Sequence, residues 1–280
     1  MSFATSRNTP LRKHFVARRH PTDMTTGDDP KRRVKTTDTV LEILNALQSL
    51  NGATLAELTG ELKFAKSTIH SHLATLESNE YVLRSGDEYE LSLKFLEHGM
   101  FVKNNRAIAR MGGPILEELA AETGEVAWII VEEHGKAVYL DKAMGERAVQ
   151  THASIGGRAR LHHLATGKLI LAYLSEERVE EIIDRHGLPK LTPNTITDPN
   201  ELRAELDRIR EEGIALNNKE TVDGVRAIGA PVLGQETIHG AISVSGPANR
   251  LTVDRCHEEV KPTLLEAANE LELKLQYPQN

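Results

Sequence analysis

Apolar residues recur along the first third of the chain at the spacing of short amphipathic helices. The first set follows Asp38, a candidate N-cap, and stops before Asn51-Gly52. It occupies one helical face and consists of Val40, Ile43, Leu44 and Leu47. Thr54 and Glu57 then form a capping box for a second helix. The apolar face of that helix is Leu55, Leu58 and Leu62.

A third helix is predicted over residues 65–79, with its apolar face formed by Ala65, Ile69, Leu73 and Leu76. Two short β-type runs follow, residues 81–84 and 88–91, separated by the turn Ser85-Gly86-Asp87. Three short helices followed by a hairpin are the pattern of a winged helix-turn-helix. We therefore predict such a domain over residues 36–91.

The remaining pattern predicts a linker helix and a larger domain. Residues 92–105 carry Leu93, Leu96 and Met100 on one side, which is either internal core or a dimer seam. Residues 106–277 then alternate between strand-like and helical runs. The strand-like runs are 126–131, 136–143, 148–153, 214–217, 227–233 and 238–245, and the helical runs are 106–123, 164–174, 176–186, 199–212 and 254–275. Because several of these runs are joined by hairpin turns, we predict an α+β fold with a mainly antiparallel sheet.

Composition narrows the class of protein. The 280 residues are 39% hydrophobic, which suffices for two buried cores, yet the longest apolar run is far shorter than a membrane span. No N-terminal stretch has the layout of a secretion signal. The single Cys256 allows neither an internal disulfide nor a cysteine metal cluster. We therefore expect a cytoplasmic protein with no membrane partner.

Charge complicates the interpretation of a nucleic-acid binder. The net charge is −7, and residues 36–90 contain three basic side chains, Lys63, Lys66 and Arg84, against nine acidic ones. Phosphate neutralisation supplies much of the affinity of a DNA-binding protein, so this module alone would bind weakly. Residues 1–35 are basic and lack apolar periodicity, which predicts a disordered arm that could follow the DNA backbone. A dimer or tetramer would multiply weak contacts.

The third predicted helix carries the candidate DNA-binding residues. With Ile69 and Leu73 facing inward, small polar side chains face outward and can bond base edges in the major groove. We select Lys66, Ser67, Thr68, His70 and Ser71 on this helix and Arg84 on the hairpin. The less specific interpretation is a three-helix bundle with an exposed polar face.

Other chemistry is weakly supported. His162-His163 lacks the partners at metal-ligand spacing that a metal site requires, so His162 is better interpreted as a hydrogen-bonding residue at a helix start. Cys256 and His257 are adjacent in a predicted helix, so their side chains diverge and do not form a nucleophile–base pair. Gly156-Gly157-Arg158 lacks the Lys-Ser/Thr of a phosphate loop and is better interpreted as a tight turn. We expect no enzyme activity, no metal and no cofactor.

Several segments together resemble the isocitrate-lyase-regulator (IclR-type) family of transcription regulators. In the N-terminal part the resemblance is carried by Ser67–His70, Leu73–Glu77 and Tyr81-Val82, within residues 54–92. In the C-terminal part it is carried by Leu161–Ala172, Glu212-Gly213, Ala230–Val232 and Ala241–Pro247. The resemblance covers about residues 36–277. The sequence departs from the usual family pattern at Ser71, Arg160, Asn217 and Ala227.

The resemblance implies a GAF-like effector domain over residues 106–277, assembly into homodimers or homotetramers, and binding to palindromic operators in double-stranded DNA. It also implies a small-molecule effector, such as a small organic acid or a sugar derivative. The effector-binding positions carried over are Ala165, Thr166, Asn217, Ala227, Ser243 and Ser245. Ser243 and Ser245 lie two residues apart on one predicted strand, so both hydroxyls face the same side.

Two functional hypotheses follow. The first is a ligand-responsive, sequence-specific transcription regulator of metabolic genes, in which effector binding shifts the population of operator-competent molecules. The second is a metabolite-binding protein or enzyme whose helix-turn-helix serves protein contacts.

Overall fold

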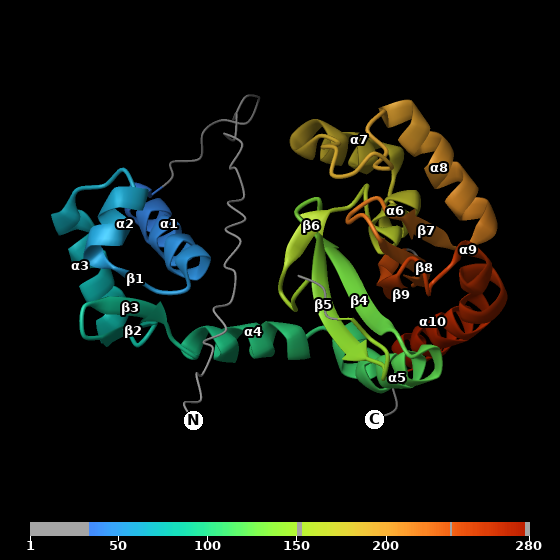
Figure 1. Cartoon of the computed structure of the whole chain (residues 1–280), viewed down its shortest axis with the longest axis horizontal. Coiled ribbons are helices and arrows are strands. Elements are labelled where there is room, and N and C mark those ends of the chain that lie inside the picture. Colours follow the sequence, from blue (N-terminus) through green and yellow to red (C-terminus); the bar gives the residue numbers. More distant parts are fainter. Residues whose placement is uncertain (1–33, 150–152, 236, 278–280) are drawn as a thin grey trace, which may run out of the picture. The chain divides into compact units, whose positions relative to one another are not determined.

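The computed structural model describes residues 34–149, 153–235 and 237–277 and divides into two compact units between Ser92 and Leu93 (Figure 1). The predicted arm therefore lies outside the described residues, except that Val34 is the N-cap of the first helix and Lys35 its first residue. No described helix is long and apolar enough to cross a membrane.

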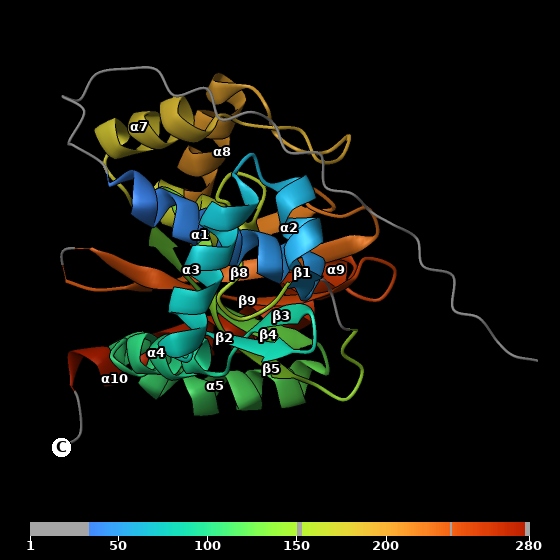
Figure 2. The same cartoon turned by 90° about the vertical axis from the view of Figure 1, so that its left-hand side faces the viewer.

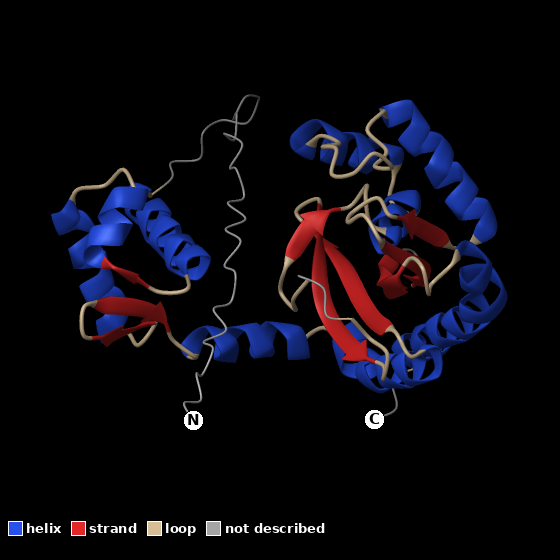
Figure 3. Cartoon of the chain, in the orientation of Figure 1, coloured by secondary structure: helices blue, strands red, loops and turns tan. Residues whose placement is uncertain are grey.

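The first unit is a winged helix-turn-helix. Its elements are α1 (Lys35–Leu50), β1 (Ala53–Thr54), α2 (Leu55–Glu61), α3 (Lys66–Ser78), β2 (Val82–Ser85) and β3 (Glu88–Leu91). The three helices enclose a small core in which Ile43, Leu58 and Leu73 are completely buried. The strands form an antiparallel sheet in the order β1-β3-β2, and Figure 3 shows this sheet beside the helices.

Most local signals in this unit act as predicted. Asn51 ends α1 in the left-handed conformation, and Thr54 and Glu57 form the reciprocal capping box of α2. The prediction that Asp38 caps α1 was wrong: the helix begins at Lys35, so Asp38 lies in its first turn, where its charge suits the helix dipole. Strand β1 was not predicted, because two residues are too few to show an alternating pattern.

The second unit begins with α4 (Lys94–Asn104), the predicted linker helix, and continues into an α+β domain. The helices of that domain are α5 (Ala107–Thr123), α6 (Ala165–Ala172), α7 (Glu176–His186), α8 (Pro199–Glu212), α9 (Val253–Arg255) and α10 (Lys261–Gln276), with a π-helical turn at Cys256–Val260. The strands are β4 (Val126–Glu133), β5 (Lys136–Met144), β6 (Arg158–Arg160), β7 (Ala215–Asn218), β8 (Val225–Leu233) and β9 (Ile238–Pro247). They form one antiparallel sheet in the order β6-β5-β4-β9-β8-β7.

Helices cover both faces of this sheet, so the domain has three layers. Helices α5 and α10 pack on one face, while α6 packs on the other and is itself covered by α8. Figure 2 shows α5 and α10 on one side of the strands and α7 and α8 on the other. Because both faces are buried, β4 begins with a continuous apolar run.

The predicted strand over residues 148–153 was wrong for the residues that the structure describes. Residues 150–152 lie outside the described part of the chain, and the flanking residues are not in a strand. The amide groups of Gly145 and Arg147 donate instead to the carbonyls of Glu125 and Gly124, which folds the chain back toward the end of α5. The edge strand is β6, which pairs with β5 after the predicted tight turn at Gly156.

Candidate functional site

Helix α3 exposes a polar face. Ile69 and Leu73 are fully buried, which leaves the five predicted α3 residues exposed: Lys66, Ser67, Thr68, His70 and Ser71. The Ser71 hydroxyl donates to the Ser67 carbonyl at 2.9 Å, so its proton is occupied and its oxygen remains an acceptor. The face can therefore make both donor and acceptor contacts to base edges.

Arg84 closes the hairpin that forms the wing. Its Nε donates to the Gly86 carbonyl at 3.0 Å, and its guanidinium lies 5.4 Å from the centre of the Tyr89 ring. Asp87 lies 3.9 Å from the same guanidinium. These contacts hold a half-exposed positive charge at the tip of the wing, where it was predicted.

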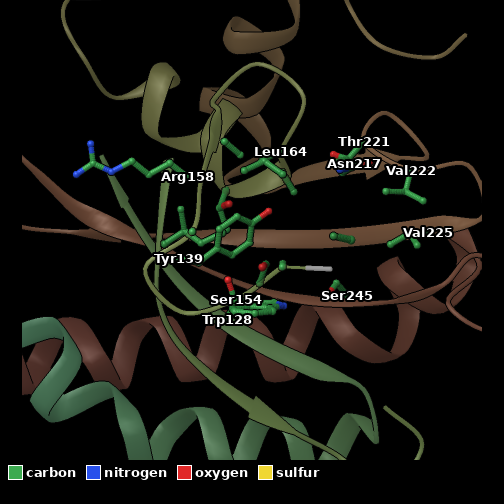
Figure 4. A pocket seen from close by; sticks show the side chains of 18 of the residues that line it. Trp128, Tyr139, Ser154, Arg158, Leu164, Asn217, Thr221, Val222, Val225 and Ser245 are labelled. Atoms are coloured by element: carbon green, nitrogen blue, oxygen red, sulfur yellow. The ribbon is translucent and has the colours of Figure 1, made fainter. Parts of the chain in front are cut away.

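A cavity of about 480 Å³ lies between α6 and the adjacent face of the sheet (Figure 4). It is lined by all six residues carried over as effector contacts: Ala165, Thr166, Asn217, Ala227, Ser243 and Ser245. They come from α6, β7, β8 and β9, and the sheet order places β7, β8 and β9 next to one another. The fold therefore brings together residues up to eighty positions apart in the sequence.

The sequence prediction missed the aromatic wall of this cavity. Trp128 and Tyr139 line it from β4 and β5, and their rings meet edge to face with centres 5.0 Å apart. Burial raises the pKa of the Tyr139 phenol to about 12, so this group stays a neutral hydrogen-bond donor at physiological pH. Alternation along β4 places Trp128 and Ile130 on one face, but only the fold shows that this face borders a cavity.

Some polar groups of the cavity wall are available to a ligand. Among the described residues, none accepts from or donates to the hydroxyls of Thr166, Ser243 and Ser245. The first turn of α6 also has no side-chain cap, so its leading backbone N–H groups have no acceptor in the described chain. Hydroxyls and free amides together form a suitable environment for an anion.

Asn217 differs from these groups because its amide is already engaged. Its Nδ2 donates to the His163 carbonyl at 2.8 Å and to Thr221 Oγ1 at 2.7 Å, while its Oδ1 accepts the Glu220 N–H at 2.8 Å. Both amide protons are thus used within the protein. Asn217 lines the cavity, but its bonds hold the turn that carries Thr221.

A buried ion-pair cluster supports the same wall. Lys168 is 1% exposed, and its Nζ lies 2.8 Å from Glu220 Oε1 and 3.0 Å from Glu205 Oε1. Burial raises the pKa of the Glu220 carboxyl, and Lys168 opposes that shift only in part. The pKa of the Glu205 carboxyl is lowered instead. Burial acts to raise it, but the hydrogen bonds from Arg208 and the charge of Lys168 outweigh burial. Sequence reasoning missed this cluster, since a lysine in an apolar helix gives no sign of its partners.

Among the described residues that line the cavity, Arg158 is the one with a charged side chain. Its guanidinium donates to Glu133 at 3.3 Å, and in Figure 4 it points away from the cavity. The cavity is therefore lined mainly by aromatic and aliphatic side chains and by hydroxyls. Such a surface suits a small, largely apolar molecule with a few polar atoms.

The histidines and the cysteine have structural environments. His162 Nε2 bonds the Pro189 carbonyl at 3.1 Å just before α6, as predicted. Burial raises the pKa of the Cys256 thiol to about 11, so it is a poor nucleophile. No group of three or more His, Cys, Asp or Glu side chains in the described part of the chain could hold a metal ion.

Comparison with known proteins agrees with this architecture. The family model described as the IclR helix-turn-helix domain matches residues 36–86, and the bacterial transcriptional regulator IclR C-terminal domain matches residues 100–273. The chain belongs to the IclR family of transcriptional regulators. It is thus a DNA-binding, effector-responsive regulator and not an enzyme, and the first hypothesis from the sequence is confirmed.

Individual IclR relatives match along nearly their whole length. The chain is 35% identical over 250 residues to the probable HTH-type transcriptional regulator ArcR of Halobacterium salinarum, which covers 88% of this chain and 95% of the relative. It is 30% identical to KipR of Bacillus subtilis, covering 85% and 97%. The crystal structure of the Thermotoga maritima IclR superposes with a TM-score of 0.73 at 30% identity, covering 87% and 99%.

We expect the stability of the effector domain to fall in acid because of His163. Burial, and then the neighbouring His162, lowers the pKa of His163 from 6.5 to about 4. The unfolded chain therefore binds a proton below pH 6.5 that the folded chain binds only near pH 4, so the free energy of unfolding decreases across this interval. When the pH falls from 7 to 4.5, the His163→Gln variant should therefore lose about 2 kcal/mol less free energy of unfolding than the unaltered chain.

Urea unfolding followed by fluorescence of Trp128, the chain's single tryptophan, measures this domain directly. His257→Gln, which removes a histidine from an exposed position of the same domain, serves as the control and should not reproduce the effect of His163→Gln. An unaltered acid slope in the His163 variant would contradict the assignment.

Proposed function

We propose that this IclR-family regulator binds a palindromic operator near a metabolic operon as a dimer or tetramer, and that the cavity beside α6 binds its effector. The observation that carries the proposal is the convergence of the six residues that resemble the family's effector contacts on one cavity. We further propose that it acts in the cytoplasm, where its operator lies.

For DNA recognition, we propose that α3 enters the major groove with Ser67, Thr68, His70 and Ser71 toward the bases. Lys66, at the first turn of α3, and Arg84, on the wing, would contact phosphates. The acidic balance of the first unit makes the counterion contribution small, so base contacts and multivalency carry a larger share of the affinity.

Alanine substitution on α3 tests this assignment. Ser67→Ala, His70→Ala and Ser71→Ala should each weaken binding to the operator roughly 5- to 150-fold, as expected for lost base contacts. Lys66→Gln should weaken binding to all DNA sequences. It should also lower the slope of the logarithm of the binding constant against the logarithm of the salt concentration by about one. Mobility shifts at two salt concentrations, on the best site from genome-wide occupancy, measure both effects.

Ser78→Ala is the matched control, because Ser78 is exposed at the opposite end of the same helix. Unchanged operator affinity in the Ser67, His70 and Ser71 variants would instead favour a helix-turn-helix that serves protein contacts.

For the effector, we propose a small organic acid, with a sugar derivative as the alternative. The free hydroxyls of Thr166, Ser243 and Ser245 and the leading amides of α6 offer donors to a carboxylate. Trp128 and Tyr139 offer an apolar wall to the rest of the molecule. A double mutant of the inducer-binding domain of PobR from Acinetobacter, 30% identical and matched over 58% of this chain with a TM-score of 0.54, was solved with 3-hydroxybenzoic acid.

Removing the hydroxyls should weaken effector binding. Ser243→Ala and Ser245→Ala should each raise the Kd about 3- to 10-fold, the usual effect of one lost hydrogen bond. A thermal-shift panel of small carboxylic acids, including 3- and 4-hydroxybenzoate, followed by calorimetry on the best compound measures it.

Thr237→Ala is the matched control, because it removes an exposed hydroxyl from the turn between β8 and β9, outside the cavity. This variant should bind as the unaltered chain does. Equal affinities in all variants would argue against the cavity as the effector site.

For assembly, we propose that α4 forms a dimer seam. This helix exposes several apolar side chains. The exposed fractions are 81% for Leu93, 58% for Leu96 and 42% for Met100, and beside them 68% for Phe101 and 55% for Val102. Exposed apolar patches of this kind usually mark a contact surface.

Truncating the seam should release monomers. The triple variant Leu93→Ala, Leu96→Ala, Met100→Ala should sediment as a monomer at concentrations where the unaltered chain is a dimer or tetramer. Leu191→Ala, 52% exposed outside α4, is the control and should not change the sedimentation coefficient. A persistent oligomer of the triple variant would exclude α4 as the seam.

A further inference from the structure

Two ion pairs anchor the end of the linker helix to the effector domain. Lys103, in the last turn of α4, places its Nζ 2.7 Å from Asp141 Oδ1 on β5. Arg106, between α4 and α5, pairs with Glu133 at the end of β4. No residue of α4 is buried, so core packing contributes little to holding this helix. We call these four residues the linker clamp.

The Lys103–Asp141 pair is better shielded than an ordinary surface pair. The two side chains are 20% and 15% exposed, whereas those of Arg106 and Glu133 are 51% and 29% exposed. Shielding from water and salt strengthens a charge pair, so Lys103–Asp141 is the stronger half of the clamp.

A β-bulge places Asp141 almost directly behind the cavity wall. In the β4–β5 ladder, Ile130 pairs with Tyr139 and Ile129 pairs with Asp141, so Leu140 is an extra residue. Tyr139 faces the cavity, while Leu140 packs with Ile129 in the core on the opposite face of the sheet. Bulges re-aim side chains and occur beside functional sites. One bulged residue therefore separates a cavity residue from a clamp residue.

The backbone around Tyr139 also belongs to the cavity wall. Its N–H donates to the Gly157 carbonyl at 3.0 Å, and its carbonyl accepts the Gly156 N–H at 2.8 Å. A molecule that pushes on the Tyr139 ring or on the turn at Gly157 would therefore displace β5 at the bulge.

The second half of the clamp reaches the cavity through a shared carboxylate. Glu133 accepts from Arg106 and also, at 3.3 Å, from Arg158, whose stem lines the cavity. Any ligand that draws Arg158 toward the cavity leaves Glu133 to Arg106 alone. Both halves of the clamp are thus connected to residues that border the cavity.

We propose that the linker clamp transmits occupancy of the cavity to the linker helix. Lys103, Arg106, Glu133 and Asp141 are positioning residues in this scheme: they touch neither effector nor DNA, and they determine how α4 is held. The proposal rests on the cavity being the effector site. Its physical requirement is that the empty and filled cavities favour different clamp geometries, because a ligand shifts an equilibrium only by its differential affinity.

Pocket-filling substitutions test this without a known effector or operator. Ala227→Leu and Ser245→Leu each add a large side chain to the cavity, one from β8 and one from β9. Because each fills the cavity by itself, the test needs only one of the two variants to fold. Hydrogen–deuterium exchange of the full chain, read over residues 94–106, should change at least about 3-fold when the cavity is filled. Asp141→Asn or Lys103→Met should abolish this response, and the swapped pair Lys103→Asp, Asp141→Lys should restore part of it.

Glu270→Gln is the matched control, because it removes an exposed ion pair with Lys274 on α10 and should leave the response intact. An unchanged exchange of residues 94–106 on filling the cavity overturns the proposal. The proposal is also overturned if the clamp variants show the same change in exchange as the chain with an intact clamp. Neither outcome depends on ligand or DNA binding, so failure of the clamp is separable from failure of the proposed function, which the ligand panel and mobility shifts report.

Discussion

The ammonium group of Lys168 is buried in the effector domain, where a charge is stable only when groups of opposite charge lie close to it. Transfer of an unpaired ammonium out of water is very unfavourable, so α6 can pack here only while Glu220 and Glu205 lie within reach. Glu205 belongs to α8, and Glu220 belongs to the turn after β7. One buried charge therefore fixes the positions of α6, α8 and that turn together. The cavity is the space these elements leave above the sheet, and its shape depends on this cluster.

The two faces of the six-stranded sheet differ because different helices cover them. On one face, α5 and α10 interdigitate with the strands in a continuous apolar core. On the other face, α6 approaches the sheet closely at Gly229, where an added Cβ would lie 2.9 Å from Leu169 and 3.4 Å from the Thr166 nitrogen. The cavity lies on this same face of the sheet, with Trp128 and Tyr139 in its wall. The bulge at Leu140 places Tyr139 and Asp141, two residues apart, on opposite faces of the sheet, whereas regular alternation would place both on the same face.

The first unit is a helix-turn-helix whose excess of acidic side chains is unfavourable for binding DNA. Its core is built mainly from aliphatic residues on three short helices, and its wing is closed by Arg84 across the turn. The nine acidic side chains within residues 36–90 lie outside the first half of α3, where Lys66, Thr68, His70 and two serines are exposed. The first half of α3 thus carries no acidic side chain, whereas on the wing Asp87 lies 3.9 Å from Arg84, so the general attraction to phosphate stays weak.

The sequence by itself determined the local structure of this protein. Asn51, the Thr54–Glu57 box, Asp198-Pro199 and Gly213 set helix ends through bonds within a few residues, and the order of helices and hairpins identified both domains. Resemblance to a family placed six residues that the fold then gathered around one cavity. Only the tertiary structure decided that Asn217 is saturated by His163 and Thr221, that Lys168 is buried, and that the edge strand beside β5 is Arg158–Arg160. These outcomes depend on contacts between residues that are distant in the chain, such as Lys168 and Glu220, and no local periodicity encodes which distant partner a side chain will meet.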